Sequence, residues 1–320
     1  EKRNHIGGNV YDSYNEDGIL IHNYGPHIFH TNSQSVYQYL SQFTQWNDFW
    51  HRVLTYVDGN LIPMPITVET INKLYNLNLD CSQVEDFLKK QAVEIDEVTT
   101  SKEVALSKVG PDIYSKIFEN YTKKQWGIDP AELDTSVISR IPIRLNRDTR
   151  YFAEKMAANK NIKIMLNTDY KEVIGDISYE KLIYTGPADD YYDYKYGRLS
   201  YRSIHFAFET YDKETFQEAP VVNYPNDYDY TRITEFKKLT WQEHRKTTIC
   251  KEFPCAEGEP YYPFPTKDCK AQFALYAEEM KKESKVIFLG RLAEYKYYNM
   301  DAAVKRALDV FEQMQKAAQN

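Results

Sequence analysis

Apolar residues recur along the chain with two clear spacings, and each spacing predicts a kind of element. Residues 52–65 alternate between apolar and polar side chains around Asp58-Gly59-Asn60, which predicts a β-hairpin. From residue 67 to residue 126 the spacing changes to three and four, which predicts a block of helices that ends at Gly127. The helical spacing is clearest in Val68, Ile71, Leu74 and Tyr75.

The rest of the chain mixes short strands with single helices. Apolar runs predict strands at residues 19–22, 162–166, 181–184 and 286–289. Polar turns divide residues 201–248 into several strands, which predicts an antiparallel sheet. Two helices are expected, at residues 35–43 and 301–319. The apolar face of the second helix is expected to contain Val304, Leu308, Phe311 and Met314.

Strands near both ends of the chain, separated by a helical block and a run of strands, predict an α/β protein with a discontinuous nucleotide-binding domain. We expect that domain to contain residues 1–35, 153–186 and 284–320. A helical domain is expected at residues 66–128. The substrate domain, an antiparallel sheet, is expected to contain residues 36–65, 129–152 and 187–283.

Charge and composition exclude several classes of protein. The net charge is −7 and the chain has no basic run, which argues against a nucleic-acid partner. No apolar stretch is long enough to span a bilayer, and no leader sequence is visible, so we expect a cytoplasmic protein. The four cysteines have no metal-binding spacing. Because the chain opens at Glu1 without a methionine, we expect a further segment before it.

Glu1 and the glycine pair Gly7-Gly8 form the first candidate binding motif. An acidic side chain after the second strand of a dinucleotide-binding fold accepts hydrogen bonds from a ribose. Adjacent glycines let the backbone approach a pyrophosphate closely. An ordinary glycine turn would have the same sequence, so both interpretations stay open.

Two further motifs combine aromatic rings with positive charge. Tyr121 and Trp126 stand at the end of the helical block, where they could hold a planar base or simply cap the block. Arg140 and Arg232 stand among apolar, proline and tyrosine residues. Guanidinium groups bind diphosphate oxygens in a bidentate manner, although a solvated surface position is the ordinary alternative.

His27, His30 and the run from Gly290 to Asn299 complete the candidates. The two histidines lack a partner cluster of metal-ligand type, so we expect them to contact a cofactor or the core and expect no metal. The run from Gly290 precedes the last helix, whose N-terminus could face an anion. The sequence has no GxSxG, HExxH or P-loop motif, so catalysis would depend on a cofactor.

Taken in order, these motifs closely resemble those of the bacterial UDP-galactopyranose mutases, from Glu1 to the last helix. The resemblance rests on EKRNHIGGN, YGPHIFHT, VDGNLIPMPI, YTKKQWG, RIPIR, IYTGP, YRS, YTRI, EPYYP and GRLAEYKYY. It implies an FAD/NAD-binding (Rossmann-like) domain with an inserted helical bundle and an antiparallel β-sheet domain. It also implies an isomerase that interconverts UDP-galactopyranose and UDP-galactofuranose. In that family N5 of reduced FAD attacks the anomeric carbon, and the adduct allows the ring to contract.

The resemblance also assigns roles to individual residues. Catalytic roles fall on His30, Arg140 and Arg232. Contacts with FAD fall on Glu1, Gly7, Gly8, Asn9, His30, Arg291 and Tyr298. Contacts with UDP-galactose fall on Tyr121, Trp126, Arg140, Tyr151, Arg232, Tyr262 and Tyr297. The family further implies a homodimer, without membrane insertion, in the biosynthesis of cell-wall or surface polysaccharide.

Three departures from the family pattern affect these expectations. Family members carry a first strand and glycine loop before the position of Glu1, and a Gln-Gly-Ile-Pro segment after the position of Phe152. Asn299 stands where they usually have aspartate. We therefore expect the 320 residues alone to bind FAD poorly. Two alternatives are a degenerate UDP-sugar-binding remnant without flavin activity and an amine-oxidase-like flavoprotein, although the second would not explain YTKKQWG or the two arginines.

Overall fold

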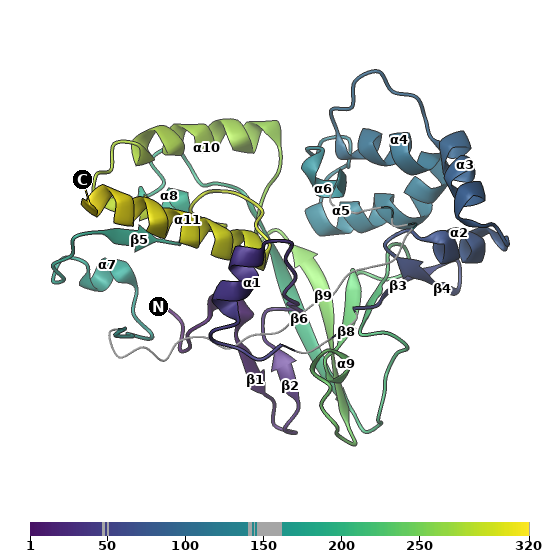
Figure 1. Ribbon diagram of the computed structural model, residues 1–320, viewed down its shortest axis with the longest axis horizontal. Helices are drawn as coiled ribbons and strands as arrows, with labels where there is room; N and C mark the ends of the chain where they lie inside the picture. The colour runs from purple at the N-terminus through teal and green to yellow at the C-terminus, as the bar shows by residue number, and fades with distance from the viewer. Residues whose placement is uncertain (47–48, 50, 140–142, 144, 146–161, 320) are drawn as a thin grey trace.

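The computed structural model describes residues 1–46, 49, 51–139, 143, 145 and 162–319. A central sheet connects two helical regions (Figure 1). A block of short helices lies at one end of the sheet, and two longer helices lie at the other, near both chain termini (Figure 1). In the described part of the chain, no helix is both long and apolar enough to cross a membrane.

The central sheet has seven strands in the order β10-β6-β9-β8-β7-β3-β4. Their bounds are β3 (Val53–Val57), β4 (Asn60–Met64), β6 (Tyr201–Tyr211), β7 (Val221–Asn223), β8 (Arg232–Glu235), β9 (Thr247–Cys255) and β10 (Tyr262–Pro263). The predicted hairpin at residues 52–65 is confirmed, with Gly59 in its turn at φ 82°. Every pairing is antiparallel except that of β3 with β7. The predicted antiparallel sheet is therefore mixed, because the hairpin joins its edge from a distant part of the sequence.

The helical block at residues 67–126 is also confirmed. It contains α2 (Val68–Tyr75), α3 (Cys81–Gln91), α4 (Ser101–Ile113), the π-helix η2 (Tyr114–Glu119), α5 (Asn120–Trp126) and, after a loop, α6 (Ser136–Ser139). Thr67, Asp80 and Thr100 begin the first three helices, because each side chain accepts a backbone N–H from the first turn. The apolar faces meet in one core that includes Ile71, Val84, Leu88, Val104 and Ile113.

Two glycines set the direction of the chain that leads to α5. Gly110 has φ 77° inside α4, and a Cβ atom there would lie 2.1 Å from the carbonyl oxygen of Gln91. Only glycine fits this close approach, and the chain bends there before it enters the π-helix. Gly127 has φ 75° and ends α5 as a left-handed cap. The cap therefore fixes where α5 ends.

The remaining elements surround the two chain ends. They are η1 (Gly8–Val10), β1 (Asp12–Tyr14), β2 (Leu20–His22), α1 (Gln34–Leu40), α7 (Tyr170–Val173), β5 (Leu182–Tyr184), α8 (Ala188–Tyr191), α9 (Lys237–Thr240), α10 (Lys267–Met280), β11 (Val286–Phe288) and α11 (Met300–Gln319). Strand β5 pairs with β11 in parallel, so the strands predicted at residues 181–184 and 286–289 are confirmed. Helix α1 packs on α11, where Val36 and Leu40 meet Val304 and Leu308.

Two details of the sequence prediction are wrong. Residues 162–166 form no strand, and Ile162, Ile164 and Met165 are exposed. The segment lies beside the N-terminus, where the amino group of Glu1 donates to the Met165 carbonyl. No described strand pairs with it, so the apolar run does not form a strand. Phe311 of α11 is 57% exposed, so it does not belong to the buried face of that helix.

Candidate functional site

A cavity of about 220 Å³ lies where α5, α6, β8 and β10 meet, and we call it the aromatic cavity. Five of the residues predicted to bind substrate line it, although they come from distant parts of the sequence. The lining residues are Tyr121, Thr122, Gln125, Trp126, Ser136, Val137, Ile138, Arg232, Tyr262, Pro263, Pro265 and Tyr297.

The rings of this cavity support one another. Residues 121, 122, 125 and 126 share one face of α5, which is the face that lines the cavity. The buried indole of Trp126 meets the Tyr262 ring edge-on at 6.3 Å between centroids. Tyr262 in turn stacks on Tyr297 at 5.2 Å, with only 10° between the ring planes. The rings therefore form one continuous aromatic wall.

Arg232 brings a permanent positive charge to the cavity. It stands directly opposite Glu252 across β8 and β9, and its Nε lies 3.0 Å from Oε2 of that carboxylate. Glu252 is buried, with 2% exposure. Burial lowers the pKa of Arg232, but Glu252 and the neighbouring Tyr121, Tyr262 and Tyr297 together outweigh burial and raise the pKa above its usual value. The guanidinium therefore stays charged and is held in one orientation.

The hydroxyls of Tyr121 and Tyr262 stay protonated. Burial raises the pKa of Tyr121 and that of Tyr262. A protonated hydroxyl can donate a hydrogen bond, so these groups suit an anionic ligand.

His51 lies beside the same charged groups, and sequence reasoning missed it. Burial, followed by the charges of Arg232 and His30, lowers the pKa of His51 to about 4. The predicted catalytic residues His30 and Arg232 both lie close enough to His51 for their charges to act on it. Glu252 was missed as well. Its position just after the predicted sheet at residues 201–248 is a signal that could have found it, because acidic residues are seldom buried unless they are paired.

A second cavity, of about 570 Å³, lies beside the N-terminus, and we call it the N-terminal cavity. It is lined by residues 1–3, 8–9, 168–170, 182–187, 190, 259–261 and 291–292. Glu1, Gly8, Asn9 and Arg291, all predicted to bind cofactor, are among them. The other predicted cofactor contacts, Gly7, His30 and Tyr298, are not among the lining residues.

The glycine pair leaves the N-terminal cavity open. Gly7 has φ 91° and Gly8 has φ 54°, a region that glycine adopts easily. A Cβ atom added to Gly8 would meet nothing within 4 Å, so the backbone there is accessible to a ligand. Glu1 accepts a hydrogen bond from the Arg3 N–H through Oε1 at 3.0 Å. These groups fit the ribose and pyrophosphate of a dinucleotide.

Arg291 lies between the two cavities. Its Nη1 donates to the Tyr261 carbonyl at 3.1 Å, and its Nη2 donates to the Tyr298 carbonyl. Its guanidinium lies over the rings of Tyr262 and Tyr297, at 5.2 and 5.1 Å from the ring centroids. One arginine that lines the N-terminal cavity therefore also supports the wall of the aromatic cavity.

Arg140 and Tyr151 lie outside the described residues. One group of metal-ligand type occurs in the described part of the chain, where atoms of Asp12, His22 and His27 lie within 4.8 Å of one another. Protein contacts account for this group. The His27 N–H donates to His22 Nδ1, and His27 Nε2 lies 3.2 Å from Asp12 Oδ1. The expected absence of a metal stays a prediction.

Comparisons with known proteins identify the family of this chain. The UDP-galactopyranose mutase family model matches residues 116–297, and a model of NAD(P)-binding Rossmann-like domains matches residues 1–43. A probable UDP-galactopyranose mutase of Klebsiella pneumoniae is 33% identical over 342 residues, which cover 100% of this chain and 88% of the relative. A UDP-galactopyranose mutase of Mycoplasma pneumoniae is 30% identical over 98% of this chain and 89% of its own.

Two further relatives bear on the fold and on the substrate. A dTDP-fucopyranose mutase of Escherichia coli is 32% identical over 97% of this chain and 89% of its own. A crystal structure of reduced UDP-galactopyranose mutase superposes with a TM-score of 0.71 at 14% identity, and the match covers 98% of this chain and 87% of that one. The α/β fold class with a Rossmann-like domain is thereby confirmed. The chain belongs to the UDP-galactopyranose mutase family.

Proposed function

We propose that this protein interconverts UDP-galactopyranose and UDP-galactofuranose. The observation that carries the proposal is the aromatic cavity, in which Arg232 is fixed by Glu252 and surrounded by Trp126 and tyrosines. A charged guanidinium beside flat rings and hydroxyl donors matches a nucleoside diphosphate, which offers a planar base and an anionic group.

The lining residues divide this work between base and diphosphate. Tyr121 and Trp126 hold the uracil. Arg232, Tyr262 and Tyr297 bind the diphosphate, on which negative charge grows as the bond to the sugar breaks. A preorganised cation stabilises that growing charge more than it stabilises the bound substrate. From the family resemblance we place Arg140 and Tyr151 beside the same phosphates.

We infer that the cofactor is FAD, in its reduced form for activity. The coarser statement, a Rossmann-like dinucleotide domain, rests on the family model for residues 1–43. Glu1 would hold the ribose, and Gly7, Gly8 and Asn9 the pyrophosphate. His30, Arg291 and Tyr298 would lie beside the flavin ring. When bound, a reduced flavin supplies a nitrogen nucleophile for the anomeric carbon, which none of the sequence motifs provides.

Four properties of the protein remain proposals that rest on the family resemblance. We propose a homodimer, a cytoplasmic location and a role in cell-wall or surface polysaccharide biosynthesis. We also propose the division into a nucleotide-binding domain, a helical domain at residues 66–128 and a sheet domain, with the boundaries given above. One contact crosses these boundaries. Residues 36 and 40, which the division assigns to the sheet domain, pack on the C-terminal helix of the nucleotide-binding domain.

The test is anaerobic incubation of the full-length protein with UDP-galactopyranose, followed by chromatographic separation of the two UDP-sugars. Conversion is expected after reduction with dithionite and not before it. Equal rates in the oxidised and reduced states would contradict a flavin nucleophile. UDP binding without conversion would leave the degenerate UDP-sugar-binding remnant. Parallel incubation with dTDP-fucopyranose decides between the two substrates named for the relatives.

A further inference from the structure

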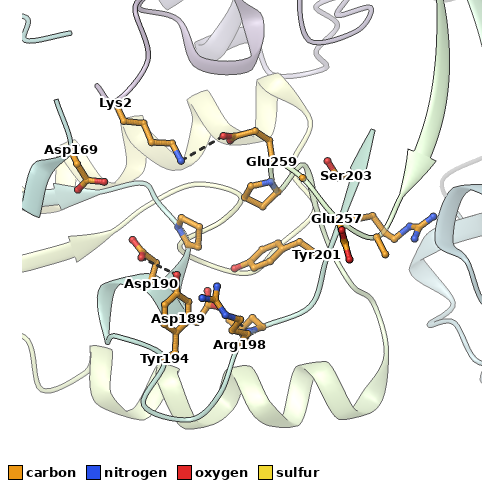
Figure 2. A pocket seen from close by; sticks show the side chains of 16 residues that line it. Lys2, Asp169, Asp189, Asp190, Tyr194, Arg198, Tyr201, Ser203, Glu257 and Glu259 are labelled. Carbon is orange, nitrogen blue, oxygen red and sulfur yellow. Dashed lines mark hydrogen bonds and ion pairs between the residues drawn. The ribbon is translucent and has the colours of Figure 1, made fainter. Parts of the chain in front are cut away.

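A third cavity, of about 530 Å³, opens beside the N-terminal cavity, and we call it the acidic cavity. Figure 2 shows its wall, where Arg198 lies on the ring of Tyr194, 3.9 Å from the ring centroid. Arg202 also lines this cavity. Unlike Arg198, its side chain reaches through the wall toward the helix that carries the aromatic residues of the substrate site.

Arg202 caps the C-terminal end of α5. Its Nε donates to the Gln125 carbonyl at 2.9 Å, and its Nη2 donates to the Lys124 carbonyl at 3.2 Å. Carbonyls in the last turn of a helix have no partner within the helix. A bidentate guanidinium therefore satisfies two of them at once and also complements the negative end of the helix dipole.

The hydrogen bonds with the end of α5 are the main polar contacts of the Arg202 guanidinium in the described part of the chain. Arg202 is 7% exposed, and burial lowers its pKa. Among the residues that the structure describes, no carboxylate forms an ion pair with it. The fit around it is close, because a Cβ atom at Gly127 would lie 3.0 Å from Nη1 of Arg202. The negative end of α5 is thus the group that compensates the buried charge.

Arg202 is also tied to the opposite wall of the aromatic cavity. It pairs with Tyr262 across strands β6 and β10, and its carbonyl accepts the N–H of Tyr261. One residue therefore joins the helix end that carries Trp126 to the strand that carries Tyr262. Helix α5 has seven residues and follows a π-helix, so its own hydrogen bonds hold it weakly.

We propose that Arg202 is a positioning residue for nucleotide binding, which sets the distance between Trp126 and Tyr262 by clamping the end of α5. This inference rests on the proposed function, in which those rings and Tyr121 hold the UDP moiety. Arg202 itself lies behind the rings and does not line the aromatic cavity. Its effect should therefore appear in nucleotide affinity more than in the chemical step.

The test compares Arg202→Ala with Arg198→Ala in the full-length flavin-loaded protein. Arg198 lines the same cavity, yet no hydrogen bond joins its side chain to α5. For Arg202→Ala we expect UDP affinity to fall about tenfold and KM for the UDP-sugar to rise by a similar factor, while kcat changes by less than about threefold. Arg198→Ala should match the wild type in all three.

Chemical rescue separates positioning from general structural support. The acidic cavity gives small solutes access to the place that Arg202 vacates, so millimolar guanidinium should restore much of the UDP affinity of Arg202→Ala. Urea at the same concentration should not.

Wild-type UDP affinity in Arg202→Ala, or equal losses in Arg198→Ala, would overturn the proposal. Should Arg202→Ala fail to fold, Arg202→Lys replaces it, with an intermediate KM expected and a wild-type KM contradicting the proposal. A wild-type protein that binds no UDP would instead contradict the proposed function.

Discussion

The aromatic cavity and the N-terminal cavity are built in opposite ways. The first is formed by a helix and sheet strands, and its key charge is paired with a carboxylate that is 2% exposed. The second is formed by turns, strand β5 and an exposed chain end, with Gly8 at positive φ. In our proposal, side chains bind the ligand in the first cavity, and accessible backbone binds it in the second.

This difference predicts how each cavity responds to mutation. A buried ion pair couples binding to folding, because removal of one partner leaves the other charged and desolvated. An open glycine turn has no such coupling, because an added methyl group there meets solvent or ligand and nothing else. Variants of the aromatic cavity should therefore lose stability along with activity. Variants of the N-terminal cavity should lose ligand while the protein stays folded.

The largest effect is expected for Arg232→Ala. Loss of a charge-assisted contact to the leaving diphosphate should cost about 2–4 kcal/mol in kcat/KM. The same change leaves Glu252 buried and unpaired, which should lower the free energy of unfolding by about 3 kcal/mol. Steady-state kinetics and urea unfolding measure the two quantities separately.

A double variant separates the two losses. Arg232→Ala combined with Glu252→Gln removes the unpaired charge, so it should regain much of the lost stability and none of the lost activity. Wild-type kcat/KM in Arg232→Ala would remove this arginine from the site. Equal stability of the single and double variants would show that the ion pair does not couple binding to folding.

The sequence anticipated the aromatic cavity better than its supports. Tyr121 and Trp126 were found because an amphipathic helix ends at glycine, a pattern visible within a few residues. The positions of Glu252 and Arg202 depend on strand register. Glu252 lies opposite Arg232, and Arg202 opposite Tyr262, only after strands from different parts of the chain have paired. Strand register depends on long-range contacts, so a single sequence does not reveal it.

The failure at residues 162–166 has a related cause. An apolar run indicates a buried strand only when neighbouring strands cover it, and in the described part of the chain this run lies against the N-terminus with exposed side chains. The hairpin at residues 52–65 succeeded because its partner strand is local and its turn contains glycine.

Protonation of His51, which lies beside Arg232 of the aromatic cavity, should lower the stability of the protein at acid pH. Burial, Arg232 and His30 lower the pKa of His51 from 6.5 to about 4. Between these values the unfolded chain binds more protons than the folded protein, so stability falls as the pH falls through this window. His51 alone should lower the unfolding free energy by about 2 kcal/mol between pH 6.5 and pH 5.

Urea unfolding at the two pH values, for wild type and His51→Gln, measures this contribution. The variant should lose about 2 kcal/mol less than the wild type on acidification. His205→Gln, an exposed histidine on β6, is the control. An identical pH dependence in wild type and His51→Gln would show that His51 is not buried beside Arg232.

Gly8→Ala should show the opposite behaviour of the N-terminal cavity. Its φ of 54° costs an alanine about 1 kcal/mol, and the new methyl group enters the space expected for the pyrophosphate. Flavin content should fall sharply, while the unfolding free energy should fall by only about 1 kcal/mol. Gly18→Ala is the matched control, because Gly18 also has positive φ and open space but lies outside the cavity lining. Equal flavin content in the two variants would contradict the assignment.

The smallest expected effect is spectroscopic, and it tests whether the aromatic wall binds a base at all. Trp126 is buried against Tyr262 and Phe264, so UDP should change its emission by contact with the indole rather than by exposing it to water. The change should saturate with UDP and disappear in Trp126→Phe, whose other tryptophans remain as an internal reference. Saturable UDP binding with unchanged Trp126 emission would place the base elsewhere. Trp126 would then be only the cap of the helical block, and the aromatic cavity would bind the diphosphate alone.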